Sequence, residues 1–422
     1  MLMFNDDSPK NVSQHFIPDE NDCRTCNMCV SHCPTFKIKP QQEESPRGRL
    51  KMISKILNEG ATLSPEEQVH LNNCVECRAC EKVCPSKMRY LKLLGKARDK
   101  LPSMPILPVV RSLLYFTSHH TTLLRFFKGL RLYQQSGLQD MANKLGLLKL
   151  TKTEKLHNML PRMPEYKHLA KYYAATSDQR GSVGLFTGCL SNAMDNPTLH
   201  ATIKVLNSLG YDVHVPQQQQ CCGAIHKHND DKATADQLAE LNLRAFKRLN
   251  VDAIVFTASG CGSPLQQYKR RKLSDEIRPE VELFESKLKE INEFLADQAW
   301  PEHLTLEPIN KRVAVHEPCS QRFPLGTHEK AYTFLQRIPG IDLIPLPENN
   351  ICCGAGGTYM LTHTEMSNAI RAEKLNHLKD SNADILLTSN IGCALHLAAG
   401  INQENLDVVI AHPVELLAQQ LK

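Results

Sequence analysis

The spacing of apolar residues along the chain changes character near residue 181. Before that point, residues 50–57 carry apolar side chains at helical spacing and Gly60 follows them, which predicts a helix. Ser64 and Pro65 predict the start of a second helix, because Ser is a favoured N-cap and Pro is tolerated at the first helical position. After residue 181, short apolar runs alternate with amphipathic helical segments, and this alternation predicts an α/β fold.

The α/β pattern occurs twice in the same order. Short apolar runs predict strands at 183–186, 213–215, 253–256, 313–315, 341–345 and 384–388. Helical spacing predicts helices after Asn196-Pro197 and over 231–249, 329–338 and 364–380. Because the second half repeats the order of the first, we expect an internal duplication of two small α/β units packed as a pseudo-symmetric pair.

A basic amphipathic segment precedes the α/β half. From Leu101 to Gln139 there is no acidic residue, while four basic side chains alternate with leucines and phenylalanines: Arg111, Arg125, Lys128 and Arg131. Such a segment fits two interpretations, an element on a membrane surface or a cover for a neighbouring domain or subunit. Residues 150–180, which contain Pro161 and Pro164, are expected to be a linker.

Composition narrows the class of protein. With 422 residues, 41% hydrophobic and 23% charged, the chain should form about two to four soluble globular domains. A net charge of +5 is too mild to indicate a nucleic-acid partner. No run of about 18 apolar residues occurs, so we expect no transmembrane helix, and any membrane contact should be peripheral or through a partner. Residues 1–21 are expected to be a flexible, polar lead-in without the apolar core of a signal peptide.

Eight of the sixteen cysteines form two runs of identical spacing, Cys23-x-x-Cys26-x-x-Cys29-x-x-x-Cys33-Pro34 and Cys74-x-x-Cys77-x-x-Cys80-x-x-x-Cys84-Pro85. This is the bacterial ferredoxin spacing for two [4Fe–4S] clusters, in which the Cys before Pro ligates the other cluster. The expected ligand sets are therefore Cys23, Cys26, Cys29 and Cys84 for one cluster, and Cys74, Cys77, Cys80 and Cys33 for the other. Zinc knuckles or a disulfide framework would need neither the third Cys of each run nor the closing Cys-Pro.

The other eight cysteines are divided equally between the two α/β repeats. They are Cys189, Cys221, Cys222 and Cys261 in the first, and Cys319, Cys352, Cys353 and Cys393 in the second. They follow predicted strands or lie in Gly-containing loops, where a backbone can wrap closely around a ligand. We expect one further iron–sulfur cluster in each repeat, with zinc or a metal-free thiol site as the alternative. Adjacent cysteines need not reach the same cluster, and a histidine could complete a set: His226 or His228, and His316, His363 or His396.

These patterns predict a multidomain protein of α and α/β parts, with a helix-rich ferredoxin module followed by two duplicated cysteine-rich α/β domains. The expected boundaries are 1–100 for the helical ferredoxin domain, 101–180 for the amphipathic helical linker, and 181–300 and 301–422 for the two repeats. Iron-ligating thiolates require a reducing compartment, so we expect a cytoplasmic protein, free or peripheral on the inner face of the cytoplasmic membrane. Arg47 and Arg49, between the cysteine runs, fit either contacts to cluster sulfurs or an acidic partner, or a solvated helix start.

The repeated Cys…Cys-Cys-Gly…Cys pattern resembles the cysteine-rich domain of heterodisulfide reductase subunits. The layout from about residue 20 onward resembles the glycolate oxidase iron–sulfur subunit family, most closely over 45–49, 257–262, 352–363 and 390–393. The wider superfamily often closes each repeat with Cys-x-x-Cys, but here Pro264 and His396 occupy the last position. That departure argues against the five-cysteine noncubane cluster of heterodisulfide reductases and against the anaerobic glycerol-3-phosphate dehydrogenase relative.

The resemblance implies an electron-transfer subunit that accepts electrons from flavin-containing 2-hydroxy-acid oxidase subunits and passes them to a quinone or another acceptor. Glycolate would be oxidised to glyoxylate at FAD bound only in those partners. The chain itself has no dinucleotide fingerprint, P-loop or catalytic triad, so no catalytic residue is expected in it. The alternatives are a D-lactate or other 2-hydroxy-acid dehydrogenase subunit, a heterodisulfide reductase-like thiol enzyme, and an assembly protein with clusters only in its ferredoxin half.

Overall fold

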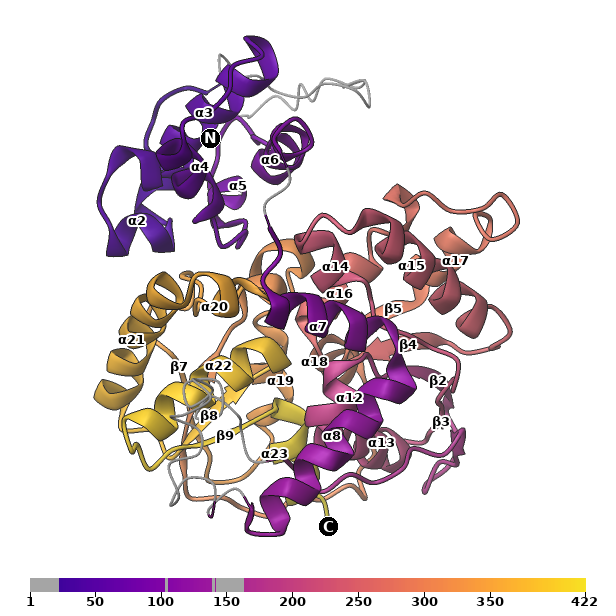
Figure 1. The fold of residues 1–422 in the computed structure, drawn as a ribbon. Helices are drawn as coiled ribbons and strands as arrows, with labels where there is room; N and C mark the ends of the chain where they lie inside the picture. The colour runs from indigo at the N-terminus through magenta and orange to yellow at the C-terminus, as the bar shows by residue number, and fades with distance from the viewer. Residues whose placement is uncertain (1–22, 103–104, 139–140, 142–162) are drawn as a thin grey trace, which may run out of the picture. The chain divides into compact units, whose positions relative to one another are not determined.

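The computed structural model describes residues 23–102, 105–138, 141 and 163–422. The chain divides into two compact units, Met1–Met104 and Pro105–Lys422 (Figure 1). The expected lead-in at 1–21 and residues 150–162 of the expected linker lie outside the described residues.

The N-terminal unit is built from short helices, and its described residues contain no strand. The helices are α1 (Met28–Ser31), α2 (Pro34–Ile38), α3 (Pro46–Asn58), α4 (Pro65–Asn72), α5 (Ala79–Lys82) and α6 (Tyr90–Arg98), with a 3-10 turn, η2, at Gln42–Glu44. Ser64 caps α4 as expected, because its hydroxyl accepts from the Glu67 N–H and the Glu67 carboxylate accepts from the Ser64 N–H. Apolar side chains of α3 and α6 form the small core between the helices.

The backbone repeats itself across the two cysteine runs. Thr25 and Asn27 have φ of 50° and 60°, and Glu76 and Arg78, at the equivalent positions, have φ of 57° and 66°. Left-handed backbone is unfavourable for residues other than glycine, so its recurrence at the same two positions marks a constrained loop. The cysteine runs therefore share a loop conformation as well as a spacing.

The C-terminal unit contains two sheets that share four strands in the same order, and the first sheet has one additional edge strand, β1. In the first sheet the order is β1-β3-β2-β4-β5, formed by β1 (Tyr172–Tyr173), β2 (Gly181–Phe186), β3 (Tyr211–His214), β4 (Ala253–Phe256) and β5 (Leu288–Glu290). In the second the order is β7-β6-β8-β9, formed by β6 (Arg312–His316), β7 (Asp342–Pro345), β8 (Ile385–Thr388) and β9 (Val409–Ala411). All pairs are parallel except β1 with β3. The predicted duplication and the six predicted strands are confirmed.

Helices surround both sheets (Figure 1). Around the first sheet they are α12 (Leu190–Met194), α13 (Asn196–Ser208), α14 (Ala224–His228), α15 (Lys232–Lys247), α16 (Ser259–Leu265), η3 (Tyr268–Arg270), α17 (Glu280–Lys287) and α18 (Ile291–Asp297). Around the second they are η4 (Gln321–Leu325), α19 (Lys330–Leu335), α20 (Tyr359–Thr362), α21 (Thr364–Ser381), α22 (Ile391–Gln403) and α23 (Pro413–Gln420).

The last helix of each repeat packs against the other repeat. Helix α23 packs against α13 of the first repeat, where Lys204 Nζ donates to the Ala418 carbonyl at 2.7 Å. Helix α18 packs reciprocally against α19 of the second repeat, where Lys330 Nζ lies 2.8 Å from Asp297 Oδ1. One apolar cluster therefore contains side chains of both repeats. Each repeat thus depends on a helix of the other repeat to bury its apolar surface.

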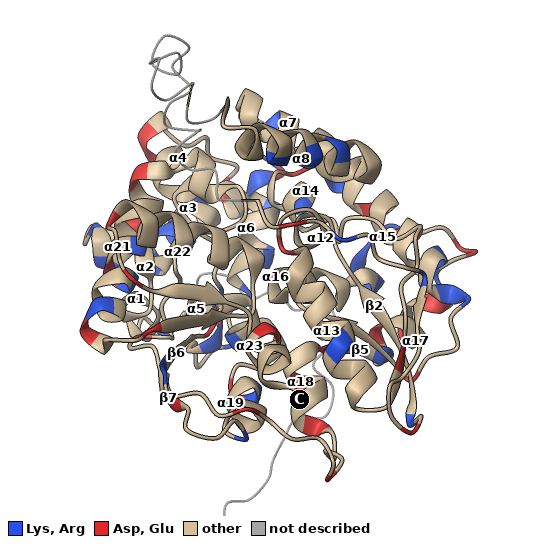
Figure 2. Ribbon diagram, turned by 90° about the horizontal axis from the view of Figure 1, so that it is seen from below, with Lys and Arg blue, Asp and Glu red and all other residues tan. Residues whose placement is uncertain are grey.

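The basic amphipathic segment forms α7 (Pro108–Ser118) and α8 (His120–Gln135). The buried Leu123 and Phe127 join the apolar cluster of the first repeat, and the Thr117 hydroxyl lies 3.2 Å from His226 Nε2. Figure 2 shows basic residues along these helices, of which Arg125 and Lys128 are exposed. The apolar face thus covers a neighbouring domain, the second of the two interpretations. Among the described helices, none has the length and apolar character needed to cross a membrane.

Candidate metal centres

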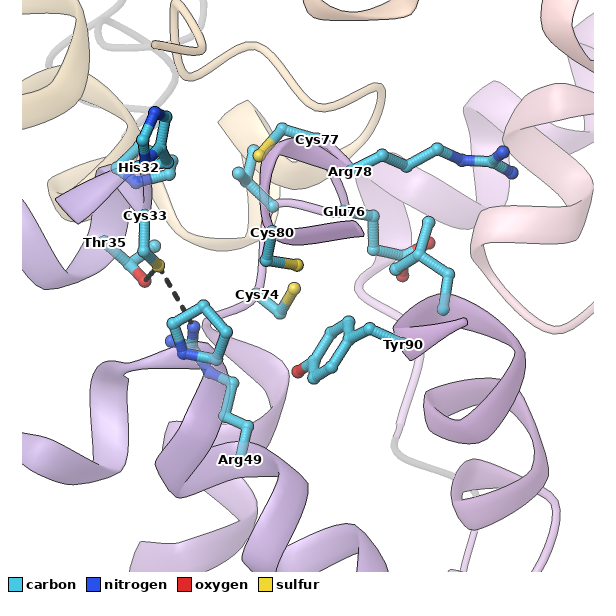
Figure 3. Close-up of a pocket in the computed structure, with 14 residues that line it drawn as sticks. His32, Cys33, Thr35, Arg49, Cys74, Glu76, Cys77, Arg78, Cys80 and Tyr90 are labelled. Atoms are coloured by element: carbon cyan, nitrogen blue, oxygen red, sulfur yellow. Dashed lines mark hydrogen bonds between the residues drawn. The ribbon is translucent and has the colours of Figure 1, made fainter. Parts of the chain in front are cut away.

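The N-terminal unit gathers its eight thiols in two groups, and each group takes its fourth member from the other run. Cys33 lines a cavity together with three cysteines of the second run, Cys74, Cys77 and Cys80 (Figure 3). In the other group, burial and then Cys23 raise the pKa of the Cys29 thiol to about 11, and Cys84 and Cys26 add to this effect. The structure thus brings together the two crossed sets expected from the spacing.

Local backbone geometry explains the crossing. Each run has two left-handed residues between its cysteines, and the first three thiols of the second run line one cavity. Cys33 is the N-cap of α2, and Pro34 occupies the first helical position, where its missing N–H costs nothing. In the first run the chain therefore leaves the loop as a helix, which separates Cys33 from the three thiols before it. The second run continues from Cys84 without a helix until α6.

A buried arginine lies directly behind Cys33. Arg49 is 1% exposed, and its Nη1 lies 3.8 Å from the Cys33 sulfur. Its Nε donates to the His70 carbonyl at 2.7 Å, and its Nη2 pairs with the Glu44 carboxylate at 2.5 Å. The burial of Arg49 shows that the interpretation of this arginine as a solvated helix start is wrong. Its contact with the Cys33 sulfur agrees with the other interpretation, and the contact to cluster sulfurs stays a prediction. Arg47 is half-buried and donates to Asn27 Oδ1 at 3.1 Å.

The fully buried carboxylate of Glu44 holds that arginine in place. One of its oxygens pairs with Arg49, and the other lies 2.7 Å from both His70 Nδ1 and Asn73 Nδ2. Sequence reasoning did not find Glu44 or His70. The sequence does show that Glu44 directly precedes Ser45, the N-cap of α3. A carboxylate at that position can reach an arginine in the first turn of the helix.

The cavity around Cys74 fits an anionic, sulfur-rich group. The Tyr90 hydroxyl lies beside Cys74, is buried, and has no hydrogen-bond partner among the described residues (Figure 3). Burial, and then Cys74, raise the pKa of Tyr90 well above its usual range, so the hydroxyl stays protonated and able to donate. Four thiols, an unpartnered donor and the Arg49 cation together suit a [4Fe–4S] cluster, whose sulfurs accept hydrogen bonds.

The first repeat gathers its four thiols at the carboxyl ends of β2, β3 and β4. Cys189 Sγ lies 3.4 Å from Cys221 Sγ, and the Gly223 N–H donates to Cys221 Sγ at 3.4 Å. Hydrogen bonds from the thiols of Cys221 and Cys261 hold the pKa of Cys222 well below its usual range. Both adjacent cysteines therefore face the same group of thiols, which fits metal ligation by thiolates.

The second repeat forms the equivalent group after β6, β7 and β8. Cys319 Sγ lies 3.8 Å from Cys352 Sγ, and the Gly354 N–H donates to Cys352 Sγ at 3.4 Å. The Cys353 and Cys393 sulfurs and a ring nitrogen of His316 all lie within 4.8 Å of one another. The second group thus contains a histidine besides its four cysteines.

The two histidines considered for the first repeat do not join its thiols. His226 uses both ring nitrogens, one 3.2 Å from the Thr117 hydroxyl and the other 2.9 Å from an Asp231 carboxylate oxygen. His228 is exposed at the end of α14. The structure therefore groups neither histidine with the cysteines.

The three histidines considered for the second repeat differ from one another. His363 stacks on Tyr359 at a centroid distance of 4.4 Å, and His396 Nε2 lies 3.1 Å from the Ser367 hydroxyl. His316 is 2% exposed and lies beside the thiols. Burial, and then the nearby Lys374, lower the pKa of His316 to about 3, so its ring is neutral. Of the three, the structure groups only His316 with the cysteines.

The two repeat sites meet across the pseudo-symmetric interface. The hydroxyls of Ser259 and Ser320 lie 2.8 Å apart. The Gly260 N–H donates to Asn390 Oδ1 at 3.3 Å, and Asn390 Nδ2 donates to Cys393 Sγ at 3.2 Å. A short hydrogen-bonded path therefore leads from the residue next to Cys261 to a ligand candidate of the other repeat.

Family comparisons agree with this division. The cysteine-rich domain family matches residues 183–266 and 313–398, and the 4Fe-4S dicluster domain matches 22–88. Residues 107–161 match the linker region of the glycolate oxidase iron-sulfur subunit. The expected architecture of a ferredoxin-type region followed by two cysteine-rich α/β domains is confirmed.

Similar proteins span nearly the whole chain. A probable glycolate oxidase iron-sulfur subunit of Bacillus subtilis is 32% identical, covering 94% of this chain and 93% of its own length. The glycolate oxidase iron-sulfur subunit of Escherichia coli is 28% identical over 95% of this chain and 94% of its own. Lactate utilization protein A of a Geobacillus strain is 26% identical over 56% of this chain and 98% of its own. From the full-length match to the Bacillus protein and the three matching domains, this chain belongs to the glycolate oxidase iron–sulfur subunit family.

Proposed function

We propose that this chain is the electron-transfer subunit of a glycolate-oxidising complex, carrying electrons from a flavin-containing partner subunit to a quinone or another acceptor. The observation that carries this proposal is the grouping of all sixteen cysteines. Eight form two crossed sets in the N-terminal unit, and eight form two sets at strand ends in the C-terminal unit. Family membership supports the choice of glycolate.

The proposed ligands are the cysteines in these groups. One [4Fe–4S] cluster would be held by Cys23, Cys26, Cys29 and Cys84, and a second by Cys74, Cys77, Cys80 and Cys33. A further iron–sulfur cluster would be held by Cys189, Cys221, Cys222 and Cys261, and another by Cys319, Cys352, Cys353 and Cys393. Bound clusters of this kind accept and release single electrons, which suits the relay between a two-electron flavin and an acceptor.

The other residues of the sites would stabilise charge near the clusters. Arg49 places a buried positive charge behind Cys33, and Tyr90 offers a hydroxyl beside Cys74. In the first repeat, the guanidinium of Arg271 helps to lower the pKa of Cys222, and its Nη2 is buried without a partner among the described residues. Donors and cations near cluster sulfurs stabilise the more negative, reduced state and so raise the reduction potential.

Substrate chemistry belongs to the partner in this proposal. Oxidation of glycolate to glyoxylate releases two electrons and two protons, which a bound FAD of the partner takes up together. The chain then receives the electrons one at a time, while the protons leave through the partner or solvent. The exposed basic residues Arg125 and Lys128 on α8 offer a surface for a peripheral contact with an anionic membrane, where a quinone would be reached.

A second candidate substrate is D-lactate or another 2-hydroxy acid. The observation that favours it is the match to lactate utilization protein A over 56% of this chain. Since the oxidised carbon would bind to the flavin subunit, this chain would perform the same electron transfer for either acid.

Co-purification and turnover test the proposal. The chain is expressed with flavin-containing 2-hydroxy-acid oxidase subunits, purified anaerobically, and assayed for acceptor reduction with glycolate and with D-lactate. We expect a complex that oxidises glycolate and loses acceptor reduction when this chain is omitted. Turnover with D-lactate but not with glycolate would show that the substrate is D-lactate and not glycolate. Flavin subunits that reduce the acceptor equally well without this chain would contradict its electron-transfer role.

A further inference from the structure

One ring nitrogen of His316 is buried without a partner beside the thiols of the second repeat. His316 lies at the end of β6, and its Nδ1 is 2.9 Å from the Thr388 hydroxyl on the paired strand β8. Its Nε2 has no hydrogen-bond partner among the described residues, although the side chain is 98% buried. Nδ1 of His120 and of His396 is also buried without a partner in the described part of the chain, but of these three histidines only His316 is grouped with cysteines. Burying a polar nitrogen without a hydrogen-bond partner costs free energy, so we expect this nitrogen to have a ligand.

The ring of His316 lies beside two of the cysteines. A ring nitrogen of His316 and the sulfurs of Cys353 and Cys393 lie within 4.8 Å of one another. Since the Thr388 hydroxyl engages Nδ1, Nε2 is the nitrogen left available to bind a metal. A histidine that ligates a metal through one nitrogen commonly has its other nitrogen fixed by a hydrogen bond. In His316 the Thr388 hydroxyl fixes Nδ1, and Nε2 is unpartnered among the described residues.

The first repeat lacks this donor. Strand register makes Phe186 the counterpart of His316, because Phe186 pairs with Phe256 at the end of the first sheet just as His316 pairs with Thr388 at the end of the second. Both phenylalanines are buried and offer no lone pair. The duplicated sites therefore share four cysteines each but differ in this one position.

We infer that His316 Nε2 is a metal ligand in the second repeat, so that the two repeats hold chemically different centres. The inference rests on the proposed function to the extent that the cysteines bind a metal. A [4Fe–4S] cluster takes four protein ligands, so His316 would replace one of the four cysteines as a ligand. In iron–sulfur centres, neutral imidazole in place of thiolate reduces the negative charge and raises the reduction potential. The second repeat would then hold the more easily reduced centre of the two.

Hyperfine spectroscopy on the full-length protein tests the assignment. The protein is purified anaerobically with natural and with ¹⁵N-labelled histidine, its iron, sulfide and zinc are counted, and the reduced form is examined by electron spin-echo methods. X-ray absorption at the zinc edge is added if zinc is found. We expect a directly bound imidazole nitrogen that shifts on labelling and is lost in His316→Phe, which copies the first repeat.

Two further variants keep this outcome interpretable. His316→Cys supplies a thiolate instead, and should retain the metal while losing the nitrogen signal and lowering the reduction potential. His363→Phe changes a histidine that stacks on Tyr359 outside the thiol group, and should retain the signal.

The outcomes separate this inference from the proposed function. A nitrogen signal that survives in His316→Phe, or is missing from a wild-type protein with metal in both repeats, contradicts the inference alone. Zinc bound by His316 upholds the ligand assignment but removes the second repeat from the electron path. Repeats that contain no metal contradict both.

Discussion

Asn390 donates to the sulfur of Cys393 across 3.2 Å, while its carbonyl oxygen accepts from the Gly260 N–H of the other repeat. A single side chain thus connects a ligand candidate of the second site to the loop that carries Cys261. Since hydrogen bonds to cluster sulfurs stabilise the reduced state, Asn390 is placed to adjust the potential of the second centre and to fix its position relative to the first.

Asn390→Ala should lower the reduction potential of the second-repeat centre. A hydrogen bond to a charged group contributes about 1.5–3 kcal/mol, so a loss that is partly offset by water corresponds to on the order of 50 mV. Potentiometric titration followed by EPR measures the shift. Asn402→Ala, an exposed position on the same helix α22, is the matched control and should leave every potential unchanged. An unchanged potential in Asn390→Ala would exclude this role.

Arg49→Met should cost the N-terminal unit both stability and iron. The substitution leaves the Glu44 carboxylate buried with its cation removed, a change that typically destabilises by about 3–5 kcal/mol. Iron and sulfide analysis with thermal unfolding measures both effects. Arg47→Met, at the half-buried neighbour, should change stability by less than about 1 kcal/mol. Equal losses of stability and iron in Arg49→Met and Arg47→Met would contradict a specific role for Arg49.

Gly48→Ala should destabilise the start of α3. A Cβ at position 48 would lie 2.0 Å from the Gln42 carbonyl oxygen, so the first turn that carries Arg49 would have to move. Overpacking of this kind costs about 1–3 kcal/mol. Gly129→Ala is the opposite control, because nothing lies within 4 Å of its Cβ position in α8 and Ala favours helix by up to about 1 kcal/mol. Unfolding midpoints should fall for the first variant and rise slightly for the second.

Glu290 should make stability fall as pH rises. Burial raises the pKa of this fully buried carboxyl from 4.5 to about 8, so the folded protein holds a proton that the unfolded chain releases. Its stabilising effect is complete below the unfolded pKa and declines by about 1.4 kcal/mol per pH unit between pH 4.5 and 8. Unfolding of wild type and Glu290→Gln from pH 5 to 9 measures this. The variant, neutral at every pH, should lose that part of the slope, and identical slopes would mean that Glu290 is ionised in the fold.

The fold was predictable where local pattern and tertiary role coincide. Central strands such as β2 and β6 are short apolar runs because both faces are buried. The edge strand β5 was not predicted, since its three residues include Lys289 and Glu290. Nothing in a local pattern indicates that α18 and α23 pack on the opposite repeats.

The cysteines of each site could be predicted from the sequence, but the side chains that surround them could not. Sixteen regularly spaced thiols are identifiable without coordinates, whereas His316 was one of five candidate histidines because sequence does not tell which strand end faces the thiols. Arg49 could equally have been a solvated residue until its burial against Glu44 was seen. Asn390 lies in a recognised motif, but its contact with Gly260 depends on the packing of one repeat on the other.

The central claim is that the cysteines of both units hold iron–sulfur clusters. Iron and acid-labile sulfide counted on the anaerobically purified full-length chain test it most directly. With two [4Fe–4S] clusters in the N-terminal unit and further clusters in the repeats, we predict about twelve to sixteen iron atoms and a similar amount of sulfide per chain. A count of about eight would show clusters only in the ferredoxin half and would contradict the claim.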